Sequence, residues 1–260
     1  MYEQSVNAAV ATALKKAENA RNNPLGYWVA SMLAGVYIGI AIILVFTIGA
    51  GFANTGHPAL RLVLGAAFGI ALTLVVFAGA ELFTGNVMFL TFGVLRRQCK
   101  ITDFLRVWVY SWCGNLVGAL ALAWLTVASG VLTAATATEF VQNVSSAKGA
   151  APVGMLIGRG ILCNFLVCLA LWTASRTTSD TAKLGLIWWC LFAFIGSGFE
   201  HSIANMTLLG MNVFIDFTAP TAWGALWYNL AWVTLGNIFG GAILAVAYHA
   251  TRNKTTPIAR

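Results

Sequence analysis

Polar side chains able to do chemistry are rare in this chain and lie inside its most apolar stretches. Glu81 and Glu200 are the only carboxylates deep in such a stretch, and His201 is the one histidine there. An intramembrane carboxylate is a functional candidate by default. Imidazole has an ordinary pKa near 6.5 and exchanges a proton around neutral pH. These residue types predict a pathway for a small solute, with His201 as its proton-exchanging group.

The two glutamates belong to a weak internal repeat. The segment 79–90 matches 198–209 at four of twelve positions, and 114–123 matches 236–245 at five of ten. Equivalent carboxylates at two helix breaks favour a structural role for Glu81 and Glu200, as caps of freed backbone N–H groups. The residue that matches His201 is Leu82, so maintenance of the fold does not require an imidazole there. This favours a functional His201 over a packing histidine.

Four further polar residues are candidates for the pathway. Thr84 offers a hydroxyl in the first break, and Asn164 lies in the middle of an apolar stretch. Asn237 matches Asn115 in the repeat, so it either satisfies backbone groups at the breaks or contacts solute. Lys148 is either a solvated loop charge or an electrostatic lure for an anion. The alternatives for Asn237 and Lys148 stay open at this point.

The composition of the chain indicates whether these residues lie in a soluble domain or in a membrane. The 260 residues are 59% hydrophobic and only 9% charged, whereas soluble domains carry about 25% charged residues. A bilayer suits this chain, and an all-α membrane protein follows because the apolar runs are long and do not alternate. Six stretches are long enough to span: 28–50, 59–79 (with 86–93 beyond a break), 104–128, 155–175, 184–209 and 224–250.

The second and fifth stretches are predicted to be broken helices. With three spans in each half, the repeat is inverted, which places a solute path between the halves at the midplane. Broken helices expose N–H groups that favour anions. The predicted organisation is an amphipathic helix over 1–26, a channel domain over 27–250 (repeats 27–129 and 155–250) and a tail over 251–260.

The basic residues predict the orientation. Twelve of the fifteen Lys and Arg residues fall on one side of the predicted spans, and Arg61, Lys148 and Arg159 fall on the other. The positive-inside rule then makes both termini cytoplasmic. The net charge of +7 therefore reports membrane topology, and no nucleic-acid partner is predicted.

Four segments resemble a known family. They are Asn-Pro-Leu-Gly at 23–26, Ala-Glu-Leu-Phe-Thr-Gly at 80–85, Cys-Asn-Phe-Leu-Val-Cys-Leu-Ala at 163–170 and Glu-His-Ser-Ile-Ala-Asn-Met at 200–206. The middle two correspond to the signature patterns of the formate/nitrite transporter family. The chain resembles that family along nearly its whole length and is most similar to its bacterial nitrite-channel branch.

The resemblance implies an aquaporin-like protomer in a homopentamer of the bacterial inner membrane, with one pore per protomer and no cofactor or metal. It implies that His201 is the central pore residue beside Thr84, that Asn164 and Asn237 lie near the pore, and that Lys148 pairs with Asn164 at the outer mouth. It implies that the N-terminal helix resembles a segment proposed to gate the cytoplasmic entrance. The implied hydrophobic constriction consists of Leu82, Phe83, Phe194, Phe68 and Leu72.

The predicted function is passage of a small monovalent anion, nitrite first, with formate or hydrosulfide as alternatives. His201 either gives the anion a proton, so that the neutral acid crosses the apolar slit, or stabilises the anion as imidazolium. A proton-coupled secondary carrier could use the same residues. An aquaporin-class channel would carry an Asn-Pro-Ala box at each break, and the sequence has none. A membrane enzyme would need clustered histidine or acidic ligands, so no enzyme is predicted.

Overall fold

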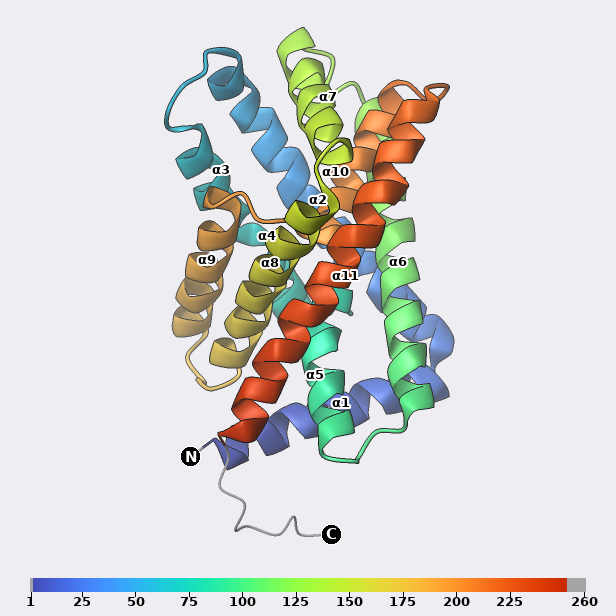
Figure 1. Cartoon of the computed structure of the whole chain (residues 1–260), viewed down its shortest axis with the longest axis vertical. Helices are drawn as coiled ribbons and strands as arrows, with labels where there is room; N and C mark the ends of the chain where they lie inside the picture. Colours follow the sequence, from blue (N-terminus) through green and yellow to red (C-terminus); the bar gives the residue numbers. More distant parts are fainter. Residues whose placement is uncertain (1, 252–260) are drawn as a thin grey trace.

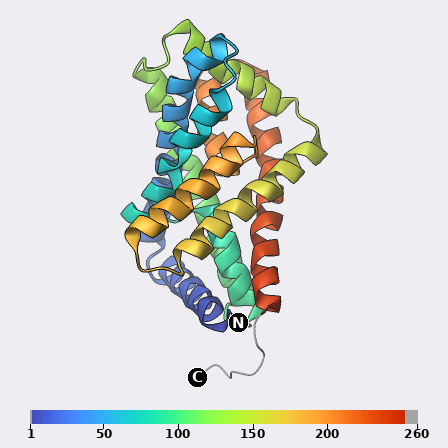
Figure 2. The ribbon, with the colours of Figure 1, turned by 90° about the vertical axis from the view of Figure 1, so that its left-hand side faces the viewer.

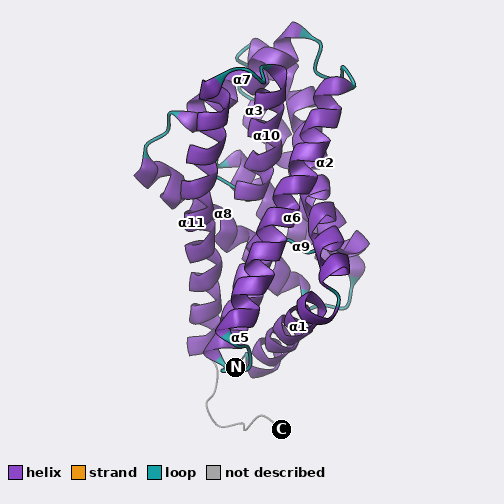
Figure 3. Cartoon of the chain, turned by 90° about the vertical axis from the view of Figure 1, so that its right-hand side faces the viewer, coloured by secondary structure: helices purple, strands orange, loops and turns teal. Residues whose placement is uncertain are grey.

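The computed structural model describes residues 2–251, and every regular element in that range is helical (Figure 3). This confirms the all-α prediction. Apart from Thr251, the predicted tail over 251–260 lies outside the described residues. The elements are α1 Glu3–Asn22, α2 Pro24–Asn54, α3 Leu60–Phe68, α4 Ile70–Leu74, the π-helical turn η1 Val75–Gly79, α5 Phe83–Leu95, α6 Ile101–Ala128, α7 Ala135–Gly149, α8 Val153–Ala174, α9 Asp180–Gly196, α10 Ser202–Ile215 and α11 Pro220–Ala250.

Five apolar helical segments of the described chain are long enough to cross a bilayer: Pro24–Asn54, Leu60–Gly79, Ile101–Ala128, Val153–Ala174 and Pro220–Ala250. They coincide with five of the six predicted stretches. The remaining stretch, 184–209, is divided between the shorter helices α9 and α10. The connection between 128 and 153 contains a helix that the sequence analysis did not predict, α7, and Lys148 lies in its last turn rather than in a loop.

The amphipathic N-terminal helix is present as α1, and Figure 1 shows it lying across one end of the bundle. Its buried residues recur every three or four positions: Val6, Ala9, Val10, Ala13, Ala17 and Ala20. The helix ends before Pro24, which begins α2 and has no N–H to donate. The Asn23 side chain caps α2 by accepting a hydrogen bond from the Gly26 N–H at 3.0 Å.

Long helices pack in two pairs, α2 along α6 and α8 along α11. The two short apolar helices fill opposite halves of the bundle, with α5 toward the α1 end and α10 toward the α7 end (Figure 1). On the side that faces the viewer in Figure 2, α9 contacts both α3 and α8. This arrangement leaves the starts of α5 and α10 near the middle of the bundle.

Both predicted breaks are present, and each follows a glycine in the left-handed region. Gly79 has φ +84° and Gly198 has φ +76°, a conformation that costs a residue without Cβ little. The chain then runs extended into the next helix, through Leu82 at the start of α5 and His201 at the start of α10. We name residues 79–82 the Glu81 break and residues 197–201 the Glu200 break.

Candidate functional site

Asn115 satisfies the backbone of the Glu81 break. Its side-chain Oδ1 accepts from the N–H of Phe83 at 3.0 Å, and its Nδ2 donates to the carbonyls of Ser31 at 2.7 Å and Glu81 at 2.9 Å. One amide on α6 therefore joins the start of α5, the break and α2. Because Asn115 is fully buried, these three bonds replace water that the backbone groups cannot reach.

Asn237 does the same at the Glu200 break. Its Oδ1 accepts from the N–H of Ser202 at 2.8 Å, and its Nδ2 donates to the carbonyls of Gly160 at 2.8 Å and Glu200 at 3.0 Å. The open alternative for Asn237 is settled in favour of the backbone. The prediction that the carboxylates of Glu81 and Glu200 cap the freed N–H groups is wrong, because the two asparagines have that role.

Each glutamate side chain instead binds a lysine. The Glu81 carboxylate accepts from Lys16 Nζ at 2.6 Å and from the Tyr27 hydroxyl at 2.8 Å. The Glu200 carboxylate accepts from Lys148 Nζ at 2.5 Å. Both carboxylates also accept from the asparagine five residues later in the chain. Both charges are thus compensated, as buried charges require.

Asn164 lies between the two halves of the bundle. Its Nδ2 donates to the carbonyls of Thr84 at 3.1 Å and Asn237 at 2.7 Å, and its Oδ1 accepts from the Cys168 thiol at 3.6 Å. The expected pairing of Lys148 with Asn164 is therefore wrong: the lysine binds a carboxylate, which offers it an opposite charge. The amide of Asn164 is occupied by backbone carbonyls.

The His201 ring bridges the two breaks. Nδ1 accepts from the backbone N–H of Ala204 at 3.2 Å, and Nε2 lies 2.9 Å from Thr84 Oγ1. A neutral imidazole carries one proton, so occupation of Nδ1 as an acceptor assigns that proton to Nε2, which donates to Thr84. To become charged, the ring must give up its bond with Ala204. The predicted neighbourhood of His201 and Thr84 is confirmed.

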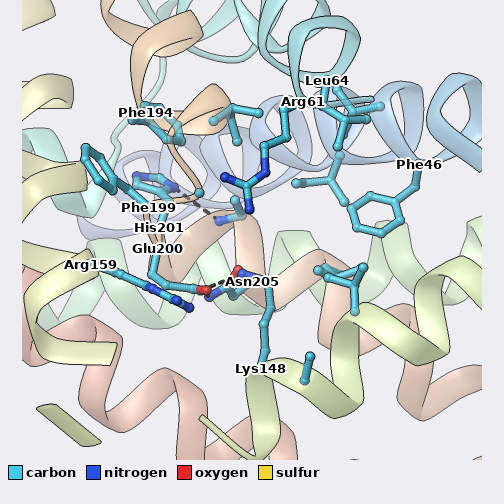
Figure 4. Close-up of a pocket in the computed structure, with 18 of the residues that line it drawn as sticks. Phe46, Arg61, Leu64, Lys148, Arg159, Phe194, Phe199, Glu200, His201 and Asn205 are labelled. Carbon is cyan, nitrogen blue, oxygen red and sulfur yellow. Dashed lines mark hydrogen bonds and ion pairs between the residues drawn. The ribbon is translucent and has the colours of Figure 1, made fainter. Parts of the chain in front are cut away.

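A wide cavity of about 690 Å³ reaches His201 from the α7 end of the bundle (Figure 4). Its polar lining includes Lys148, Glu200 and Asn205. The other two basic residues assigned to the outer side, Arg61 and Arg159, line the same cavity. In the sequence these two arginines bore only on orientation. The positive-inside rule places them with Lys148 and apart from the other twelve basic residues, and this was the signal that could have grouped them.

A narrow apolar space of about 10 Å³ lies on the other side of His201. Four of the five predicted constriction residues line it, namely Phe68, Leu72, Leu82 and Phe194. The fifth, Phe83, does not, because consecutive side chains at the extended end of the break point to opposite sides. Its ring centroid lies 5.7 Å from that of Trp108, and it lines a separate groove with α6. Phe83 therefore lies outside this space, and its part in a constriction stays a prediction.

Three predicted pathway residues, Thr84, Asn164 and Asn237, are fully buried and line neither of these spaces. His201 and Lys148 do line the wide cavity. Within residues 2–251, no group of three or more His, Cys, Asp or Glu side chains could hold a metal ion.

The sequence as a whole matches known proteins. The family model for formate/nitrite transporters matches residues 3–251. The nitrite transporter NirC of Escherichia coli (strain K12) is 45% identical, over 100% of this chain and 96% of that protein. The formate channel FocA of the same strain is 32% identical, over 94% of this chain and 92% of that protein.

Solved structures show the same relationship. A structure described as an FNT family ion channel has a TM-score of 0.89 at 43% identity, covering 96% of this chain and 100% of that one. A pentameric formate channel with formate bound has a TM-score of 0.76 at 28% identity, covering 89% of this chain and 98% of that one. The contacts at the two breaks therefore lie within a recognised architecture, and the chain belongs to the formate/nitrite transporter family.

Proposed function

We propose that this chain forms a transmembrane pathway for small monovalent anions, nitrite first and formate second. The relatives named as nitrite transporters and formate channels cover nearly the whole chain, which supports this substrate class. The observation that carries the proposal is the position of His201, which borders both the wide polar cavity and the narrow apolar space. A permeating anion meets the imidazole where its polar surroundings end.

The proposed architecture has six spans in two inverted three-helix repeats, 27–129 and 155–250, in an aquaporin-like arrangement. The fifth span is the pair α9 and α10, and segment 60–79 with α5 makes the second. Equivalent bonds at the two breaks support the repeat, since Asn115 and Asn237 contact equivalent backbone groups. The distribution of basic residues supports cytoplasmic termini in a bacterial inner membrane, and the pentameric formate channel supports a homopentamer.

In the proposed mechanism, desolvation is the main barrier. A bare anion cannot enter an apolar space without a large cost, and the space beside Phe68 and Phe194 holds about 10 Å³, close to the minimum for one water molecule. When the ring of His201 is charged, it can give a proton to the anion and return to its neutral form, and the resulting neutral acid meets a much smaller cost. Charging the ring at Nδ1 frees the Ala204 N–H, so a positive imidazolium and an unpaired helix N-terminus arise together beside the anion.

The test is pH-dependent uptake of nitrite and formate into proteoliposomes by the unaltered chain and by His201→Phe. We expect the variant to lose most uptake and the pH dependence of whatever uptake remains. His57→Gln is the control, because His57 is exposed in the connection before α3 and lines neither the wide cavity nor the narrow space. Unchanged flux and pH dependence in His201→Phe would overturn the proton-donor role. Absence of uptake of both anions by the unaltered chain would overturn the anion pathway itself.

The closed apolar space also favours a second candidate, a proton-coupled carrier that uses the same residues. A channel gives single-channel currents in a planar bilayer under an anion gradient. A carrier that moves one proton with each anion gives uptake without net current and saturates at a rate set by conformational change. Recording current and isotopic uptake from the same preparation distinguishes the two.

A further inference from the structure

The lining of the wide cavity includes two guanidinium groups. Arg61 reaches in from α3 and Arg159 from α8, toward the space bordered by His201 and Glu200 (Figure 4). Among the described residues, neither side chain has a hydrogen-bond or ion-pair partner. Glu200, the one carboxylate of the lining, is bound by Lys148. The two arginines therefore supply the uncompensated positive charge of this cavity.

The ion pair with Glu200 separates Lys148 from the two arginines. The side chains of Lys148 and Glu200 are only 17% and 5% exposed, and a lysine held this closely by a carboxylate has little charge left to offer an anion. Arg61 is exposed, and Arg159 is half-buried. The ion pair therefore argues against Lys148 as the main residue that attracts an anion electrostatically.

The backbone of Arg159 belongs to the rigid part of the site. Its carbonyl accepts from the N–H of Glu200 at 3.3 Å, and the next residue, Gly160, binds Asn237. The side chain is therefore carried by the same hydrogen-bonded framework that holds His201. A guanidinium is a planar fork that binds carboxylate-like oxyanions through two parallel N–H bonds and stays charged at every working pH.

We propose that Arg61 and Arg159 form an anion-capture site that precedes His201 and takes planar monovalent oxyanions with two oxygens on one atom, such as nitrite or formate. This inference rests on the proposed anion pathway and adds a step to it. The site raises the local concentration of the anion at the mouth of the pathway, so it sets the concentration at which uptake half-saturates. It does not take part in proton transfer.

The transport test compares Arg61→Gln, Arg159→Gln and the double variant in proteoliposomes with nitrite on the cavity side. We expect the half-saturation concentration to rise roughly threefold to tenfold for each single variant, as loss of a partly hydrated charged hydrogen bond implies. The maximal rate should change little. Arg97→Gln is the matched control, since Arg97 is exposed in the connection between α5 and α6. A half-saturation concentration unchanged in the double variant would overturn the proposal.

Arg159→Lys separates shape from charge. The lysine keeps the positive charge but loses the planar fork. We expect it to recover only part of the affinity that Arg159→Gln loses. Full recovery would contradict recognition by a fork and would reduce the role of Arg159 to that of a point charge.

A second measurement does not depend on transport. Phenylglyoxal modifies accessible arginines, and peptide mapping of the detergent-solubilised chain gives the rate at each one. We expect nitrite or formate to slow modification of Arg61 and Arg159, but not of Arg97, more than chloride does at the same ionic strength. No such protection would overturn the site while leaving the proposed pathway intact. Protection without uptake of either anion would confirm the site and overturn the proposed function instead.

Discussion

The Glu81 break and the Glu200 break are built from the same parts. Each follows a glycine at positive φ, each has a glutamate bound to a lysine, and each has a buried asparagine that bonds three backbone groups. The lysines come from different kinds of element, Lys16 from the surface helix α1 and Lys148 from α7. These shared residues bond the backbone groups at two helix starts that lie inside an apolar bundle.

The breaks differ where chemistry is possible. The residue after Glu81 is Leu82, which lines the apolar space, and the residue after Glu200 is His201, which bonds Thr84 and Ala204. The Glu200 side chain is 5% exposed and the Glu81 side chain 16%. The duplicated glycine, glutamate and asparagine residues therefore serve as scaffold, and His201, which replaces Leu82, is the difference on which the proposed function rests.

The largest effect on stability is expected when one of the two asparagines is removed, and it tests whether the two breaks are equivalent. Asn115→Ala and Asn237→Ala each leave three buried backbone groups without their partner, at about 1 kcal/mol or more for each group. We expect each variant to lose about 3 kcal/mol of stability, seen as a large fall in the thermal unfolding midpoint in detergent and as loss of monodisperse protein. Asn143→Ala, at an exposed position on α7, is the control. If only one of the two variants were destabilised, the breaks would not be equivalent.

Removing one carboxylate at a time tests whether the more buried glutamate contributes more to the stability of the protein. Glu200→Gln leaves the largely buried Lys148 charged and without its carboxylate, so we expect about 2–3 kcal/mol of destabilisation. Glu81→Gln should cost less, because the Glu81 carboxylate is 16% exposed and that of Glu200 only 5%. The double variants Glu200→Gln/Lys148→Met and Glu81→Gln/Lys16→Met should recover part of each loss. A larger loss at Glu81 would reverse the ranking by burial, and no recovery would mean that the pairs are not coupled.

The sequence predicted the breaks, since a glycine and a carboxylate inside an apolar run are visible without a structure. It also predicted a functional role for His201, because the residue at the matching position of the repeat is Leu82. It could not assign the bonding partners, because which amide reaches which backbone group depends on how helices far apart in the chain cross. For that reason the sequence leaves the role of Asn237 open, and it predicts that Glu81 and Glu200 cap backbone N–H groups, whereas the two carboxylates bind lysines. The sequence also could not show that Glu200 binds Lys148, which leaves Arg61 and Arg159 as the basic residues of the wide cavity without an ion-pair partner among the described residues.

The bond that joins the two breaks can be weakened without changing either scaffold. Thr84→Val removes the hydroxyl that accepts from His201 and keeps the shape of the side chain. We expect the free energy of unfolding to fall by about 1 kcal/mol, which is typical of one buried hydrogen bond. We also expect the pH dependence of uptake to change, because Nε2 of the ring no longer has its hydrogen-bond partner. Thr84→Ser keeps the hydroxyl and should behave like the unaltered chain. Equal behaviour of the valine and serine variants would show that the bond has no role.

The smallest expected effect is at Ser202, which follows His201 and corresponds to Phe83 in the other break. The Ser202 hydroxyl is buried and has no hydrogen-bond partner among the described residues, although its backbone N–H is bound by Asn237. Ser202→Ala keeps that N–H and removes only the unpaired hydroxyl. We therefore expect a change in stability within about 0.5 kcal/mol and unchanged uptake. If stability held but uptake fell, the hydroxyl would be a contact for the permeating anion, and the difference between the breaks would extend from one residue to two.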